Sequence, residues 1–281
     1  MKTVRIIPRL DIKGPNLVKG IHLEGLRVLG KPSDFAKYYY EQGADELMFM
    51  DVVASLYERN SLHDIISETA KSIFIPITVG GGIRNLNDIK SMLRIGADKV
   101  SINTAAIKRP EFIREASEEF GSSTIVVSIE AIKNSDGKYY AFTDNGREYT
   151  GIEVVEWAKK AQLLGAGEIV ITSVDREGTG KGIDLDLTKS IFESVSIPII
   201  AHGGVGCVDD VKSALETESI DSIAIGSSLH YEALKNFNLD LIGRKEGNVD
   251  FLLSGRETST FDSFNLKGLK KYLHSKSIYC R

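Results

Sequence analysis

The chain has 281 residues, of which 42% are hydrophobic and 26% are charged, and its formal net charge is −4. This composition is typical of a folded globular protein, and the mild charge with scattered Lys and Arg argues against a nucleic-acid partner. No apolar run approaches the roughly 20 residues that span a bilayer, and no signal-peptide core develops after the first residues, so we expect no membrane partner and a cytoplasmic location.

Eight short apolar runs predict buried strands. In chain order they are VRIIPRL, ELMFMDV, IPITV, KVSIN, TIVVSI, EIVITSV, IPIIA and SIAIG. Their hydrophobicity is continuous, which is typical of strands covered on both faces in a parallel sheet. Amphipathic stretches between them, such as SDFAKYYYEQG and NLNDIKSMLRIG, predict helices that end at Gly. Eight such units predict an α/β fold, a (β/α)8 TIM barrel that forms one domain over 1–281.

The chain also repeats itself at half length. The segment GADELMFMDV from Gly43 resembles GAGEIVITSV from Gly165, and IPITVGGGI resembles IPIIAHGGV at the same offset of 122 residues. This pattern predicts an internal half-barrel repeat, with halves of about 1–122 and 123–281. One irregular segment, about 238–262, is predicted to be an insertion before the last helix LKGLKKYLHSKS.

Two carboxylates occupy equivalent places in the two halves. Asp11 follows the first strand in IPRLDIK, and Glu130 follows the fifth in VVSIEAIK. Equivalent strands of two related halves face each other across a barrel, and active sites of such barrels lie at the C-terminal ends of the strands. We therefore expect Asp11 and Glu130 on opposite walls of the barrel mouth, where two separated acids suit general acid–base catalysis.

Four other strand ends bring glycine or small hydroxyl residues to the same mouth. They lie in VGGGI, INTAA, HGGVG and IGSS. Glycine lets a backbone N–H approach an anion, and a helix N-terminus adds a favourable dipole. The two pairs predict two phosphate cradles and hence a bisphosphate ligand. Cys207 and Cys280 lack metal-ligand spacing and the five histidines are dispersed, so neither a metal nor another cofactor is expected.

Charged residues alternate in sign at the opposite ends of four strands. They are Arg5, Glu46, Lys99 and Glu168. Alternating charges there could close into a ring of ion pairs, and stability is the default role of this barrel face.

Seven segments carry a resemblance to a known family: IIPRLDIK, NLVKGI, GADELMFMDV, TVGGGI, GADKVSINTAA, EWAKKAQLLGAGEIVITSVDREGTGKG and IPIIAHGGVG. From residue 1 to about 230, and again in the last helix, the chain resembles the cyclase subunit of imidazole glycerol phosphate synthase. The resemblance implies a barrel that takes ammonia from a glutaminase docked at its N-terminal face. The ammonia passes along the barrel axis and converts a bisphosphorylated ribulosyl aminoimidazole carboxamide ribotide to imidazole glycerol phosphate and aminoimidazole carboxamide ribotide, in histidine biosynthesis.

The resemblance implies roles for the matching positions. Asp11 matches the first catalytic acid, and Lys19 matches the lysine of a mobile loop after strand 1. One phosphate site matches Gly82, Asn103 and Thr104, and the other matches Gly178, Gly204, Gly226 and Ser227. The ammonia gate matches Arg5, Glu46, Lys99 and Glu168. The resemblance therefore implies that this ring controls the passage of ammonia, rather than serving stability alone.

The chain departs from the family at four positions of the mouth. Glu130 and Glu177, the latter at the substrate site, stand where Asp is usual, His202 replaces a usual Ser, and Arg9 replaces a usual Cys. One methylene extends a carboxylate by about 1.5 Å, and a misplacement of about 1 Å can cost roughly a hundredfold in rate. The departures indicate either a repacked site or another substrate.

A second hypothesis is therefore kept open. Paralogues that resemble this subunit are associated with sugar amidation in surface-polysaccharide pathways, where the barrel would conduct ammonia from a glutaminase to a sugar amidotransferase. Asp11, Lys19 and the two cradles favour the cyclase. Glu130, Glu177, His202 and the insertion favour the paralogue.

Overall fold

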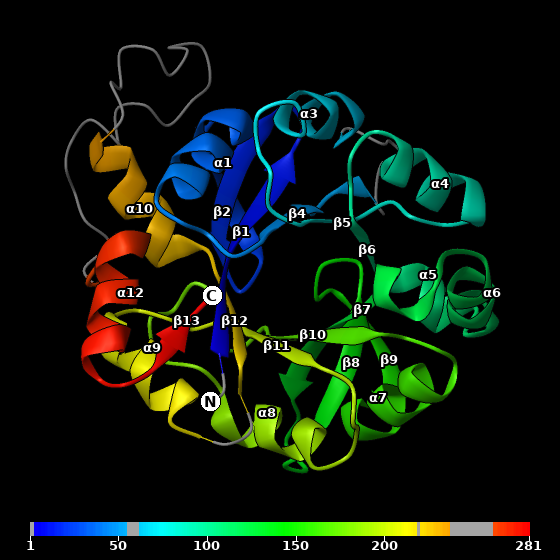
Figure 1. Ribbon diagram of the computed structural model, residues 1–281. Coiled ribbons are helices and arrows are strands. Elements are labelled where there is room, and N and C mark those ends of the chain that lie inside the picture. Colours follow the sequence, from blue (N-terminus) through cyan, green and yellow to red (C-terminus); the bar gives the residue numbers. More distant parts are fainter. Residues whose placement is uncertain (1–2, 55–61, 218–219, 237–260) are drawn as a thin grey trace.

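The structure, a computed structural model, describes residues 3–54, 62–217, 220–236 and 261–281. Within these residues, eight parallel strands form a closed barrel, seen along its axis in Figure 1. The strands are β1 (Thr3–Lys13), β4 (Leu47–Asp51), β5 (Ile77–Gly80), β6 (Lys99–Ile102), β7 (Ile125–Lys133), β10 (Glu168–Ser173), β11 (Ile199–His202) and β12 (Ser222–Ile225). The barrel closes because β12 pairs with β1 and β7 pairs with β10. The predicted (β/α)8 barrel is thus confirmed, and each of the eight apolar runs overlaps one barrel strand.

Helices surround the barrel on its outer face (Figure 1). They are α1 (Pro32–Glu41), α3 (Leu62–Thr69), α4 (Leu86–Arg94), α5 (Thr104–Lys108), α6 (Glu111–Phe120), α7 (Val154–Leu163), α8 (Leu185–Phe192), α9 (Val208–Leu215), α10 (Ser227–Asn236) and α12 (Leu266–Ser275), with a short 3-10 turn η1 (Ser122–Thr124). Their buried faces form the larger hydrophobic cluster with outward-facing strand residues such as Ile6, Leu10 and Ile12. α12 confirms the predicted last helix. The predicted insertion, about 238–262, lies outside the described residues except for its last two positions.

Two antiparallel hairpins were not predicted. β1 continues into β2 (Asn16–Ile21) and β3 (Glu24–Gly30), and β7 continues into β8 (Tyr139–Thr143) and β9 (Glu148–Glu153). The segment after the first strand, which the resemblance implied to be a loop, is therefore a hairpin here. Because β1 and β7 are the equivalent strands of the predicted halves, each half carries the same extension at its mouth. A short strand, β13 (Tyr279–Cys280), pairs with the start of β1.

The interior of the barrel is arranged in layers along its axis. Side chains alternate along a strand, so every second residue of β1 points inward. On β1 the successive inward residues are Arg5, Ile7 and Arg9, which are charged, apolar and charged. The middle layer belongs to a separate hydrophobic cluster that contains Ile7, Val18, Met48, Met50, Val52, Val126, Val170, Ile200 and Ala224. An apolar compartment thus lies between two polar layers, of which the upper one holds the candidate site.

Candidate active site

Asp11 is held in ion pairs at the upper end of β1. Its carboxylate accepts hydrogen bonds from Arg9 Nε at 2.9 Å and from Lys19 Nζ at 2.7 Å, and only 2% of the residue is exposed. Burial alone would raise its pKa, but the cationic Arg9 and Lys19 hold the pKa of Asp11 well below its usual value. Asp11 is therefore a fixed carboxylate rather than a group that exchanges protons near neutral pH.

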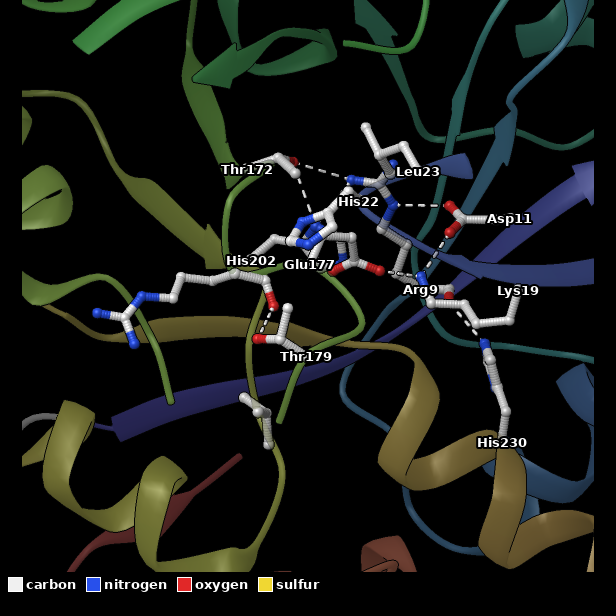
Figure 2. A network of polar contacts seen from close by, with 12 residues as sticks. Arg9, Asp11, Lys19, His22, Leu23, Thr172, Glu177, Thr179, His202 and His230 are labelled. Carbon is white, nitrogen blue, oxygen red and sulfur yellow. Dashed lines mark hydrogen bonds and ion pairs between the residues drawn. The ribbon is translucent and has the colours of Figure 1, made fainter. Parts of the chain in front are cut away.

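Glu177 and His202 complete a closed ring of side chains with these three residues (Figure 2). Lys19 also donates to Glu177, and Glu177 Oε2 lies 3.3 Å from His202 Nε2. His202 Nδ1 lies 3.0 Å from Arg9 Nη1. We call these five residues, Arg9, Asp11, Lys19, Glu177 and His202, the upper ring. Two cations and two carboxylates balance, so the upper ring is neutral when His202 is neutral.

The partners of His202 determine its tautomer. Arg9 can only donate hydrogen bonds, so Nδ1 must accept and the ring proton lies on Nε2, which is 3.3 Å from Glu177 Oε2 but makes no hydrogen bond with it. Burial, reinforced by the neighbouring Arg9, lowers the pKa of His202 to about 3. Thr172 stands beside this contact, with its Oγ1 accepting from Arg9 Nη1 at 3.0 Å. Neutral His202 therefore lies between a cation and an anion.

Glu130 is in a different environment from Asp11. Its carboxylate accepts from the backbone N–H of Gly146 at 2.7 Å, and Glu130 lines a cavity of about 390 Å³ together with Arg9. Burial raises the pKa of Glu130 to about 7, although the Gly146 N–H, Arg9 and Asn103 oppose this shift. Glu130 is therefore poised to gain or lose a proton at neutral pH.

The cavity beside Glu130 contains the first predicted phosphate cradle. Gly82, Asn103 and Thr104 line it, and the buried Asn103 Oδ1 and Ser101 Oγ have no hydrogen-bond partner within the described chain. The cavity wall also carries three cations that were not predicted: Arg84, Lys108 and Arg109. These groups suit an anionic ligand with polar substituents.

The second predicted cradle lies on the other side of the upper ring. Gly178 and Ser227 line a cavity of about 300 Å³ with Lys19, and Gly204 and Gly226 line an adjoining smaller hollow with Glu177 and His202. A Cβ atom added to Gly226 would lie 3.1 Å from Lys19 Nζ, so the ammonium reaches this cradle. Lys19 thus contacts both acids of the upper ring and borders the second cavity.

The charged residues at the lower end of the barrel form a closed ring of four ion pairs. Arg5 contacts Glu46 at 2.7 Å and Glu168 at 2.5 Å, and Lys99 contacts the same two carboxylates at 3.2 and 2.9 Å. We call Arg5, Glu46, Lys99 and Glu168 the lower ring. Although burial opposes a charge here, Glu168 and Glu46 hold the pKa of Arg5 above its usual value.

The contacts among Arg9, Thr172 and His202 were not predicted. Arg9 and His202 could be recognised in the sequence only as departures from the family, and Thr172 gave no signal at all. Among the described residues, no group of three or more His, Cys, Asp or Glu is arranged to hold a metal ion. None of the helices in the described ranges is both long and apolar enough to cross a membrane.

Comparison with known proteins identifies the family. A family model described as "Histidine biosynthesis protein" matches residues 5–235. Relatives called "Imidazole glycerol phosphate synthase subunit HisF" occur in Legionella pneumophila, with 57% identity over 75% of this chain and 99% of the relative, and in Lactococcus lactis subsp. cremoris strain MG1363, with 47% identity over 82% and 90%. An Exiguobacterium relative of the same name is 49% identical over 80% of this chain and 88% of its own.

The family model and these relatives thus place the chain among the enzymes of histidine biosynthesis, with a (β/α)8 barrel as its fold. More narrowly, the chain belongs to the imidazole glycerol phosphate synthase subunit HisF family, which the resemblance in sequence had indicated. The word "subunit" in these names implies a complex with a partner protein. The relatives do not favour the sugar-amidation alternative.

Proposed function

We propose that this protein is the cyclase subunit of imidazole glycerol phosphate synthase. It uses ammonia to convert the bisphosphorylated ribulosyl aminoimidazole carboxamide ribotide to imidazole glycerol phosphate and aminoimidazole carboxamide ribotide. The observation that carries the proposal is the pair of carboxylates at the ends of β1 and β7, which share Arg9 but differ in their affinity for protons. A reaction that adds ammonia and closes a ring needs a group that exchanges protons beside a fixed negative charge.

The two cavities suit the two ends of such a substrate. Gly82, Asn103 and Thr104 would hold one phosphate, and Gly178, Gly204, Gly226 and Ser227 would hold the other. Members of the upper ring line both sides, Arg9 with Glu130 at the first cavity and Lys19, Glu177 and His202 at the second, so a ligand that reaches both cradles would lie beside this ring. This placement supports catalysis at the centre of the mouth.

The ammonia is proposed to enter through the lower ring. A glutaminase partner would dock at the N-terminal face of the barrel, where Arg5, Glu46, Lys99 and Glu168 close the axis. Uncharged ammonia would then cross the apolar compartment above them toward Glu130, since it has less hydration to lose there than an ammonium ion.

The proposal is tested with purified protein, an ammonium salt and the bisphosphate substrate. We expect turnover to both products, and we expect Glu130→Gln to lower kcat by about a hundredfold or more because it removes the group that exchanges protons. Substrate binding measured on the same samples serves as the control. Folded protein that binds the bisphosphate without turning it over would contradict the cyclase and favour an ammonia conduit.

A further inference from the structure

Three of the four departures of the mouth from the family pattern lie within one set of side chains in contact, and the fourth lines a cavity beside them. Arg9 contacts His202 at 3.0 Å, and His202 lies 3.3 Å from Glu177. The fourth, Glu130, lines the same cavity as Arg9. Changes that touch one another are coupled, because each one alters the partners available to the next. The departures therefore describe one repacked site rather than four separate changes.

Arg9 occupies the centre of this set. The residue is 2% exposed, its Nε donates to Asp11, and its Nη1 faces Thr172 and His202. A buried guanidinium requires acceptors for its hydrogen atoms, and an imidazole that stays neutral supplies one without adding a charge. His202 meets that need through Nδ1, which lies 3.0 Å from Arg9 Nη1.

Position 9 is also fixed from the helical side of the barrel. His230 on α10 donates from Nε2 to the backbone carbonyl of Arg9 at 2.9 Å, and its Nδ1 accepts from the Tyr39 hydroxyl at 2.6 Å. All three residues are buried. The backbone beneath the guanidinium is thereby tied to α1 and α10, which limits the directions in which Arg9 can move.

We propose that Arg9 and His202 form a positioning pair that keeps Asp11 as a carboxylate and leaves proton exchange to Glu130, an inference that rests on the proposed function for the use of these protons. Arg9 neutralises Asp11 by direct contact, and its charge also acts on Glu130 across the cavity. His202 holds the guanidinium in place between the two acids. Neither residue needs to touch the reacting atoms for this role.

The charged and polar groups that face Glu130 set its affinity for a proton. Arg9 faces it from β1, Asn103 from the end of β6, and Asp144 and the Gly146 N–H from the turn between β8 and β9. Among these, Arg9 is the cation that favours the charged carboxylate, and Asp144 opposes it. Removing the charge of Arg9 should therefore make Glu130 hold its proton to higher pH.

The test follows the titration of the Glu130 carboxyl carbon by NMR, with the signal assigned by its loss in Glu130→Gln. We expect Arg9→Gln to move the midpoint upward by about one pH unit, and Arg9→Lys, which keeps the charge, to leave it near the wild-type value. Arg94→Gln, on the exposed side of α4, is the matched control for loss of one positive charge and should not move the midpoint. If Arg9→Gln does not fold, the double variant Arg9→Cys/His202→Ser carries the usual residues of the family and should show the same upward shift.

The pH dependence of ammonia-supported turnover gives a second readout. Its midpoint should move with that of the NMR titration in the same variants. An unchanged Glu130 midpoint in a folded variant without the Arg9 charge would overturn the positioning role. Absence of turnover in the wild-type protein, with the NMR shift still present, would instead contradict the proposed reaction and leave the electrostatic role of Arg9 standing.

Discussion

Asp11 and Glu130 show how two carboxylates of similar chemistry acquire different proton affinities. Asp11 is contacted directly by Arg9 and Lys19, so its charge is compensated although it is buried. Glu130 accepts a backbone N–H and borders a cavity, with no ion pair of its own among the described residues. Burial dominates for Glu130, whereas contact with cations dominates for Asp11. The two carboxylates therefore occupy equivalent positions in the predicted repeat, but their local environments give them different proton affinities.

The raised pKa of Glu130 predicts that Glu130→Gln stabilises the protein at alkaline pH. Because the pKa rises from 4.5 when unfolded to about 7 when folded, the favourable contribution of protonated Glu130 is present below pH 4.5 and is lost as pH rises through 7. Glutamine keeps the protonated shape without the charge. We expect the variant to gain roughly 3 kcal/mol in unfolding free energy relative to wild type at pH 8, and little at pH 4.

Urea denaturation at both pH values measures this difference. Glu156→Gln, on the exposed face of α7, provides the control because its surface carboxylate should give nearly the same result at pH 4 and pH 8. A Glu130→Gln effect that does not depend on pH would show that packing, rather than charge, sets its contribution.

Sequence patterns could predict the two carboxylates but not the contacts that differentiate them. Asp11 and Glu130 follow strands in equivalent positions, and that relation is visible in the repeat. The contact between Arg9 on β1 and His202 on β11 joins residues 193 positions apart. Such a pairing depends on how side chains pack inside the closed barrel, and no local periodicity records it.

At the scale of the elements, the β2–β3 hairpin brings Lys19 over the mouth. Lys19 lies on β2, and the neighbouring Gly20 meets the loop after β10 at Gly178. A Cβ atom on Gly178 would lie 2.5 Å from the Gly20 carbonyl oxygen, which is closer than real Cβ contacts. The close approach of these two backbones therefore requires glycine at position 178.

We predict that Gly178→Ala displaces the hairpin and weakens substrate binding through Lys19. Gly151→Ala is the matched control, since both glycines have positive φ angles, +71° and +73°, but an added Cβ at Gly151 meets nothing within 4 Å. The control should lose about 1 kcal/mol of stability from backbone strain alone. Gly178→Ala should lose more stability than the control. It should also raise KM for the bisphosphate by tenfold or more, because displacing the hairpin moves Lys19, which contacts both Asp11 and Glu177.

Stability from urea denaturation and KM from steady-state kinetics separate the two effects. Equal behaviour of the two alanine variants would show that the contact between Gly178 and Gly20 does not position the hairpin.

The barrel strands could be predicted because each is a continuous apolar run covered on both faces. The hairpins could not be predicted because their strands lack such a run. β2 and β3 are short, contain glycine, and mix exposed with buried residues, so neither gives a clear period. Their position follows from the direction in which β1 leaves the barrel, which is a property of the assembled fold.

At the scale of the whole molecule, the barrel is closed by charged side chains at both ends. The lower ring is partly exposed at Lys99, whose side chain is 21% accessible, while its two glutamates are buried. Each glutamate contacts both Arg5 and Lys99, so the ring depends on all four members.

Lys99→Met should destabilise the barrel by about 2 kcal/mol, because Glu46 and Glu168 would each lose one of their two cations in a buried place. Lys138→Met is the matched control. It breaks an exposed pair with Glu153 on the β8–β9 hairpin and should change stability by less than about 1 kcal/mol. Urea denaturation measures both, and equal losses would show that the lower ring contributes no more than a surface ion pair.

The apolar compartment between the two rings has a consequence for the charge state of whatever travels along the axis. Ile7, Val126, Val170 and Ile200 offer no hydrogen-bond acceptor to an ammonium ion, so the ion would lose its hydration without replacement. Nitrogen that crosses the compartment therefore arrives as a neutral base, one proton short of the form that prevails in water. Glu130, whose pKa is raised to about 7 by burial, lines a cavity that Met50 and Val52 of this compartment also border, so a group that can exchange protons meets the neutral base there.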